Sequence, residues 1–182
     1  MTTSEFRQPQ AMVIFESMFG NTEQVAHAVA EGLESKGVRT EVVEVSVAPA
    51  EIPSSVELLI VGAPTHAFSL SRPKTRVEAV RQGAPAAKAG IGLREWLATA
   101  LAAEGCSPHV AVYDTRVSKV RRLPAAAGPS AARLARRRRF TPVDRPVAFL
   151  VTDTPGPLVA GELDRANAWG RSLAPRVRLA TS

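Results

Sequence analysis

Residues 11–22 read AMVIFESMFGNT, and they give the clearest indication of the fold. Its apolar first half, AMVIF, has the composition of a buried strand, and a helical pattern follows the polar turn after it. A strand that turns sharply into a helix leaves free backbone N–H groups at the turn, and the helix dipole adds positive potential there. The turn at residues 17–22 is therefore predicted to bind a phosphate group.

The residues of the turn suit this prediction. Gly20 lets the backbone approach a ligand closely, because no Cβ stands in the way. The hydroxyls of Ser17 and Thr22 are natural donors to phosphate oxygens. The segment lacks the Gly-Lys-Ser/Thr ending of a P-loop and the Gly-x-Gly-x-x-Gly spacing of a Rossmann turn. On the turn alone, an ordinary capped strand–helix connection is an equally good interpretation.

The helix after the turn has clear start and stop signals. Asn21 is expected to cap it, with Gln24 returning the bond as in a capping box. An apolar stripe recurs every four residues, and Gly37 stands where a left-handed end is expected. The stripe consists of Val25, Val29 and Leu33.

Composition places the chain among soluble globular proteins. Its 182 residues suit one domain, predicted at residues 11–178 after a disordered tail at residues 1–10, and 45% are hydrophobic. Lys and Arg outnumber Asp and Glu by 23 to 17, which favours anionic partners. The single Cys106 excludes an internal disulfide framework, and no signal-peptide core or membrane-spanning run is found. We expect a cytoplasmic protein.

Apolar runs alternate with helical patterns along the chain. Such alternation predicts an α/β fold with a parallel sheet covered by helices on both faces. Strands are expected at residues 11–15, 38–47, 58–62, 110–113 and 147–151, the second at an edge. Further helices are expected from Ser71, which can cap, and at residues 93–103, 129–138 and 162–177. Ligands of such sheets bind beyond the carboxyl ends of strands, which directs attention to the loops after the first, third and fourth strands.

Two of these loops carry polar and aromatic groups. Residues 63–73 contain an imidazole, a phenyl ring and several hydroxyls. Residues 114–119 are polar and of mixed charge. Tyr113 ends the fourth strand, where it is either a core residue or a ring that stacks on a ligand. Trp96 and Trp169 lie on apolar helical stripes and are expected in the core.

The three loops together resemble those of the flavodoxin family. Residues 16–22, ESMFGNT, resemble the family's phosphate loop, Ser/Thr-x-Thr-Gly-x-Thr, and residues 62–66, GAPTH, resemble its second flavin loop. The forms SMFGNT, PTHAF and GLREWL are similar to those of flavodoxin-domain proteins common in actinobacteria. The resemblance implies a flavodoxin-like doubly wound five-stranded parallel sheet in the order 2-1-3-4-5 with FMN at the switch point, an arrangement for which flavodoxin itself is the standard example.

The resemblance also implies a set of FMN-binding residues. The phosphate would lie on the first loop, and the isoalloxazine between the second and third loops. His66, Phe68 and Tyr113 are the candidates for stacking on the ring. The implied site is Ser17, Met18, Phe19, Gly20, Asn21, Thr22, Pro64, Thr65, His66, Ala67, Phe68, Asp114, Thr115 and Arg116.

The chain departs from the family pattern in two respects. Phe19 stands where the family has a threonine, so one phosphate hydroxyl is missing. The chain is also basic, and Arg116, Lys119, Arg121 and Arg122 follow the fourth strand. A cation near the flavin's pyrimidine edge would stabilise the anionic reduced form, whereas Asp114 opposes this, so the net sign is open.

Two functions fit these observations. The first is an FMN-binding flavoprotein, either an electron carrier or a quinone-type reductase, that works with a redox partner protein or a small acceptor. No catalytic residue is expected, because the flavin supplies the chemistry. The alternative is a non-catalytic module that has lost FMN and uses its basic face for a partner. Residues 133–139, RLARRRR, invite a nucleic-acid interpretation, but no recognition motif accompanies them, so nucleic acid is not an expected partner.

Overall fold

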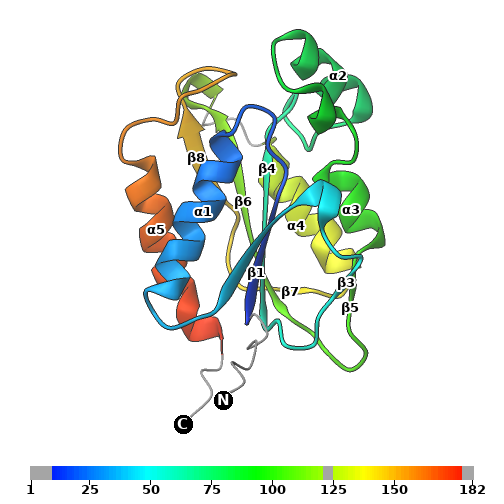
Figure 1. Ribbon diagram of the computed structural model, residues 1–182, viewed down its shortest axis with the longest axis vertical. Helices are drawn as coiled ribbons and strands as arrows, with labels where there is room; N and C mark the ends of the chain where they lie inside the picture. The colour runs from blue at the N-terminus through cyan, green and yellow to red at the C-terminus, as the bar shows by residue number, and fades with distance from the viewer. Residues whose placement is uncertain (1–9, 121–124, 178–182) are drawn as a thin grey trace, which may run out of the picture.

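The computed structural model describes residues 10–120 and 125–177 (Figure 1). The helices are α1 (Asn21–Glu34), α2 (Pro73–Arg81), α3 (Leu93–Thr99), α4 (Ala127–Arg137) and α5 (Glu162–Leu173), with 3-10 turns η1 (Val45–Val47), η2 (Ala86–Ala89), η3 (Ser118–Val120) and η4 (Ala174–Arg176). The strands are β1 (Ala11–Phe15), β2 (Thr40–Glu44), β3 (Glu51–Ile52), β4 (Leu58–Pro64), β5 (Leu101–Ala102), β6 (His109–Val117), β7 (Thr141–Pro142) and β8 (Val147–Val151).

The main sheet is parallel, with the order β2-β1-β4-β6-β8. This confirms the predicted doubly wound order. One feature was not predicted: a short strand, β7, pairs with His109 and Val110 at the start of β6, whereas β8 pairs with Tyr113 to Val117 at its end. The far edge of β6 is therefore covered by two successive pieces of chain.

Helices cover both faces of the sheet (Figure 1). α1 and α5 lie on one face, and α3 and α4 on the other. The alternation of side chains in β1 explains this, because successive residues of a strand point to opposite faces. Val13 and Phe15 pack with α1 and α5, whereas Met12 and Ile14 pack with α3 and α4. α2 stands beyond the carboxyl ends of the strands (Figure 1).

The two helices of the first face touch backbone to backbone. A Cβ added at Gly32 of α1 would lie 2.2 Å from the Asn167 carbonyl oxygen of α5. A Cβ added at Gly170 of α5 would lie 2.2 Å from the Val29 carbonyl oxygen of α1. Neither contact leaves room for a side chain, so this helix pair depends on both glycines.

Tyr113 belongs to the core. It is fully buried, and its ring makes edge-on contacts with Phe149 and Trp169 at centroid distances of 5.9 and 6.0 Å. Its hydroxyl donates to the Thr22 carbonyl oxygen at 2.9 Å. Gly62 makes room for it, since a Cβ there would meet the ring at 1.9 Å. The interpretation of Tyr113 as a flavin-stacking residue is therefore wrong.

Several element boundaries differ from those predicted. The edge strand ends at Glu44, since residues 45–47 form η1. The helix predicted at residues 93–103 ends at Thr99, because β5 pairs with β3 in a separate two-stranded sheet. α4 begins at Ala127, slightly before the predicted start. Among the described residues, no helix is long and apolar enough to cross a membrane.

The cap predictions also require correction. The N-cap of α2 is Arg72, and Ser71 is instead buried with its hydroxyl accepting from the Arg76 guanidinium. Gln10, predicted in the tail, is 7% exposed and donates its N–H to the Arg39 carbonyl oxygen, so the fold includes it. The rest of the predicted tail, residues 1–9, and residue 178 lie outside the described residues.

Glu162 links the first turn of α5 to the edge of the sheet. Its carboxylate accepts from the Leu150 N–H at 2.6 Å and forms an ion pair with Arg165 at 2.6 Å. Burial acts to raise the pKa of Glu162, but the hydrogen bonds from Arg165 and Leu150 and the Arg165 charge outweigh it, so the pKa is lowered. A carboxylate with a lowered folded-state pKa stabilises the protein above its unfolded pKa and loses this contribution as the pH falls through the folded value.

Replacing Glu162 with glutamine is expected to lower the free energy of unfolding by about 1–2 kcal/mol near neutral pH, because a charge-assisted bond is lost. The difference should be smaller at about pH 3 than at neutral pH, because the wild-type carboxylate becomes protonated as the pH falls through its folded-state pKa. Urea unfolding at both pH values measures this. Asp164→Asn, an exposed acid in the same helical turn, is the control. A deficit that stays equal at the two pH values would contradict the prediction.

Candidate functional site

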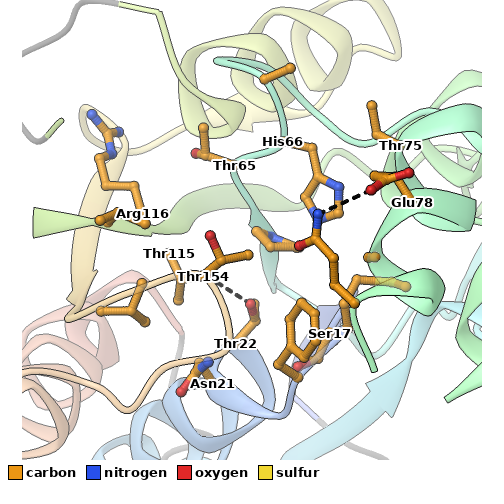
Figure 2. A pocket seen from close by; sticks show the side chains of 18 residues that line it. Ser17, Asn21, Thr22, Thr65, His66, Thr75, Glu78, Thr115, Arg116 and Thr154 are labelled. Carbon is orange, nitrogen blue, oxygen red and sulfur yellow. Dashed lines mark hydrogen bonds between the residues drawn. The ribbon is translucent and has the colours of Figure 1, made fainter. Parts of the chain in front are cut away.

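The carboxyl ends of the central strands surround a pocket of about 320 Å³ (Figure 2). The three loops singled out from the sequence all contribute to it, together with the loop after β8 and one side of α2. It is lined by Ser17, Met18, Phe19, Asn21, Thr22, Pro64, Thr65, His66, Ala67, Thr75, Glu78, Ala79, Gln82, Thr115, Arg116, Val117, Val151 and Thr154. Of the predicted site residues, only Gly20, Phe68 and Asp114 are not among those that line it.

The first loop is held open by its own side chains. The buried Ser17 accepts at Oγ from the N–H groups of Gly20 at 3.1 Å and Glu23 at 3.4 Å. Gly20 is the N-cap of α1, with φ of 89°, a conformation that favours glycine. The prediction that Asn21 caps the helix is wrong. Asn21 is the first helical residue, and its amide donates to the Pro155 carbonyl oxygen at 3.2 Å.

The backbone N–H groups of Met18, Phe19, Asn21 and Thr22 in this loop have no acceptor among the described residues. Unpaired N–H groups at the start of a 14-residue helix form an anion-binding arrangement. Because Ser17 uses its Oγ lone pairs as acceptors, its O–H remains a donor. The loop therefore offers a cradle of donors to an anion in the pocket.

Hydroxyl groups join the first loop to the third. Thr22 Oγ1 lies 2.8 Å from Thr115 Oγ1 inside the protein. Figure 2 shows Ser17, Asn21 and Thr22 at the start of α1, with Thr115 and Thr154 close to them and Arg116 beyond. The β8 loop was not predicted to contribute, because Thr154 carries no motif that marks it.

The second loop makes a tight turn over the pocket. Backbone bonds join His66 and Ser69 in both directions, at 2.8 and 3.0 Å. Ala67 and Phe68 both have positive φ, of 45° and 63°, although neither is glycine. Such conformations cost on the order of 1–3 kcal/mol each and concentrate at functional sites. Phe68 is 50% exposed at the tip of the turn, so it neither fills the core nor lines the pocket.

His66 enters the pocket as a neutral imidazole. Burial lowers its pKa from the ordinary value of 6.5. A hydrogen bond with the Thr75 backbone acts in the opposite direction, and the nearby Arg76 charge lowers the pKa further. At neutral pH the ring therefore carries no charge, and the nitrogen not bonded to Thr75 is a hydrogen-bond acceptor.

In the third loop, Arg116 forms an ion pair with Asp114. Asp114 is fully buried and accepts from Arg116 Nε at 2.7 Å and from its terminal nitrogen at 2.5 Å. It also accepts from the N–H of Gly128, in the first turn of α4, at 3.1 Å. Asp114 therefore faces α4 rather than the pocket, which explains why, of this ion pair, only Arg116 lines the pocket. Arg121 and Arg122 lie outside the described residues.

Comparisons with known proteins agree with this arrangement. The family model described as Flavodoxin matches residues 13–76, from β1 into α2. The fold is shared with a flavodoxin from the domain Archaea, at 18% identity and a TM-score of 0.61, over 91% of this chain and 96% of that one. The chain has a flavodoxin-like fold. No curated protein sequence matches it.

Other solved structures extend the likeness of fold. The Streptococcus pneumonia TIGR4 flavodoxin is 18% identical, with a TM-score of 0.62, over 92% of this chain and 99% of that one. The flavodiiron protein from Giardia intestinalis is 16% identical, with a TM-score of 0.58. The comparison with the flavodiiron protein covers 93% of this flavodoxin-like chain but 36% of that much longer one.

The departure of this flavodoxin-like protein at Phe19 has a structural explanation. Met18 and Phe19 pack against Ala79, Val80 and Ala84, at and just after the end of α2. The position where the family has a hydroxyl thus holds an aromatic ring that anchors α2 beside the pocket. Thr75, Glu78, Ala79 and Gln82 of α2 consequently line it. No local sequence pattern marks these four residues, because tertiary packing brings them to the pocket.

A buried polar cluster supports the first loop from the opposite side. Glu16 is 2% exposed and accepts from the Leu93 N–H of α3 at 2.8 Å. Arg76 is 1% exposed and lies 3.2 Å from the Glu95 carboxylate. Burial raises the pKa of Glu16, although bonds from Ser71 and Leu93 and the Arg76 charge act against this. The cluster ties the phosphate turn to α2 and α3.

Proposed function

We propose that this flavodoxin-like protein binds FMN and acts in electron transfer or in the reduction of a small acceptor. The observation that carries the proposal is the donor cradle at the start of α1, formed by four free N–H groups and two hydroxyls, which opens into the pocket. A phosphate ester is the group for which such a cradle is suited. The flavodoxin fold supports FMN as the molecule that carries it.

The residues present fit FMN. Ser17, Thr22 and the free N–H groups would hold the phosphate. Thr65 and Thr115 would border the remainder of the cofactor, because they line the same pocket. The pocket volume of about 320 Å³ lies within the range of small-molecule sites. Bound FMN would supply the redox chemistry, while the protein binds and orients it.

Arg116 is expected to have little influence on the charge around the flavin. Its guanidinium is engaged by both carboxylate oxygens of Asp114. The pair is neutral as a unit, so its effect on the midpoint potential of the flavin should be small. We also propose a cytoplasmic location, since the lone Cys106 suits a reducing compartment.

Titration of the purified protein with FMN tests the proposal. We expect a dissociation constant well below ~100 μM. Riboflavin, which lacks the phosphate, should bind at least ~10-fold more weakly, because it cannot use the donor cradle. Equal binding of the two would show that the turn does not hold the phosphate. Turnover of NAD(P)H with a quinone or dye would indicate an enzyme, whereas its absence would favour a carrier.

One observation favours the alternative, a binding module without FMN. Arg133, Arg136, Arg137 and Arg139 are exposed at the end of α4, and within the described residues none of them forms an ion pair. These free cations suit an acidic partner. Under this alternative the protein shows no FMN binding, and its partner is released as the salt concentration rises.

A further inference from the structure

We propose that the side of the pocket next to α2 is a second binding site, which takes a planar aromatic molecule carrying amino groups. The proposal rests on the proposed function only in that FMN is assigned to the other side. Figure 2 shows the two sides: His66, Thr75 and Glu78 lie together near α2, away from the group around Asn21, Thr115 and Thr154.

The floor of this side is apolar. Phe19, Met18 and Ala79 pack together and all line the pocket. Phe19 is only partly buried, so its ring remains accessible to a ligand. Aromatic rings prefer to pack on one another in offset or edge-on arrangements, which add to the effect of simple burial. A flat ring is therefore the shape that this floor favours.

Glu78, the charged residue at the rim of this side of the pocket, is a hydrogen-bond acceptor. Glu78 is fixed by Gln82, whose amide donates to Oε1 at 3.3 Å, and by Arg81, whose guanidinium lies 3.3 Å from Oε2. Each carboxylate oxygen has two lone pairs, so Glu78 can accept further hydrogen bonds. Because its side chain is 54% exposed, a ligand can reach it.

The neighbouring polar groups also favour a ligand that carries hydrogen-bond donors. The neutral His66 offers one ring nitrogen as an acceptor. The Thr75 hydroxyl is already engaged, since it accepts from the Arg72 N–H at 2.9 Å and donates to the Arg72 carbonyl oxygen at 3.0 Å. The remaining donor on this side is the second amide hydrogen of Gln82. A ligand with N–H donors is thus matched, whereas a quinone, whose polar groups are carbonyl oxygens, is matched poorly.

Isothermal titration calorimetry with two acridines tests this. Proflavine carries two amino groups, and acridine has the same ring system without them. On the FMN-loaded protein, proflavine should bind at least ~10-fold more tightly than acridine. Glu78→Gln should weaken proflavine about 10-fold and change acridine less than about 2-fold. Glu31→Gln, an exposed acid on α1, is the matched control and should change neither.

A second variant separates this site from the phosphate turn. Phe19→Thr should weaken both acridines about 3- to 10-fold, since the stacking floor is lost. The same change restores the family's hydroxyl, so FMN should bind more tightly. Equal affinity for proflavine and acridine, an unchanged affinity in Glu78→Gln, or direct competition between proflavine and FMN would each overturn the proposal. If FMN does not bind at all, the proposed function fails, and titration of the free protein with the two acridines still decides this site.

Discussion

Replacing Arg76 with methionine is expected to lower the free energy of unfolding by about 3–5 kcal/mol, the cost of breaking a buried charged cluster. Arg76 is 1% exposed and donates to the Ala89 and Gly90 carbonyl oxygens and to Ser71 Oγ. It also offsets the charges of the Glu16 and Glu95 carboxylates. Methionine fills similar space but can neither donate these hydrogen bonds nor offset these charges. Urea unfolding measures the loss.

The pH dependence of this loss in unfolding free energy shows whether it arises from the buried charges. The pKa of Glu16 is raised, so its contribution to stability is complete below the unfolded value and is lost as the pH rises through the folded value. Without Arg76 the ionised form is still less favourable. The deficit of Arg76→Met should therefore be larger at about pH 8 than at about pH 5.

Two further variants test this explanation. Adding Glu16→Gln to Arg76→Met should recover part of the loss at the higher pH, since the two residues belong to one cluster. Arg81→Met, at a position whose side chain is 73% exposed, should cost less than about 0.5 kcal/mol. An Arg76→Met deficit that is independent of pH, with no recovery in the double variant, would indicate lost packing alone.

The second large effect concerns FMN. The double variant Ser17→Ala, Thr22→Val should raise the dissociation constant of FMN about 100-fold, because each hydroxyl contributes on the order of 10-fold when its partner is charged. Riboflavin should change less than about 3-fold, since it presents no phosphate. Fluorescence titration with both ligands provides the measurement.

The control for this pair is Ser35→Ala at the opposite end of α1. Ser35 Oγ donates to the Gly32 carbonyl oxygen and is far along the helix from the phosphate turn. It should leave the affinity for FMN unchanged. An equal loss for FMN and riboflavin in the double variant would mean that the loop had collapsed, and the assigned role of the hydroxyls would be wrong.

Local sequence patterns predicted the fold well. The apolar runs at β1, β4 and β8 and the stripe of α1 are visible in the sequence, and each of them is buried in the structure. The order of the strands was predicted from the family resemblance and is also correct. The helix from Leu93 was predicted too long because β5 gains its partner from β3, about fifty residues earlier, and no local pattern records such pairing. Asn21 was predicted as the cap, but Gly20 holds that position, and Ser17 Oγ accepts from the N–H groups of Gly20 and Glu23.

The pocket was predicted only in part. The loops after β1, β4 and β6 were found because the ends of parallel strands meet at one edge of a sheet. Phe19 was noted only as a missing hydroxyl, although its packing on Ala79 is what adds α2 to the pocket. Tyr113 and Asp114 are adjacent to pocket residues in sequence but point into the core and toward α4, and residue order alone does not reveal these directions.

The contact of Gly32 and Gly170 has a consequence for motion. Helices that touch through their backbones cannot slide or separate without losing the whole contact, so α1 and α5 should behave as one rigid unit. The phosphate turn precedes α1, and the loop with Thr154 precedes α5, so these two walls are carried by the same unit. α2 lies outside this unit and is anchored separately, by the buried Arg76 and by the packing of Met18 and Phe19 on Ala79. We expect the amides of α1 and α5 at this contact to exchange slowly and at similar rates, so that any opening of the pocket must come from its other walls.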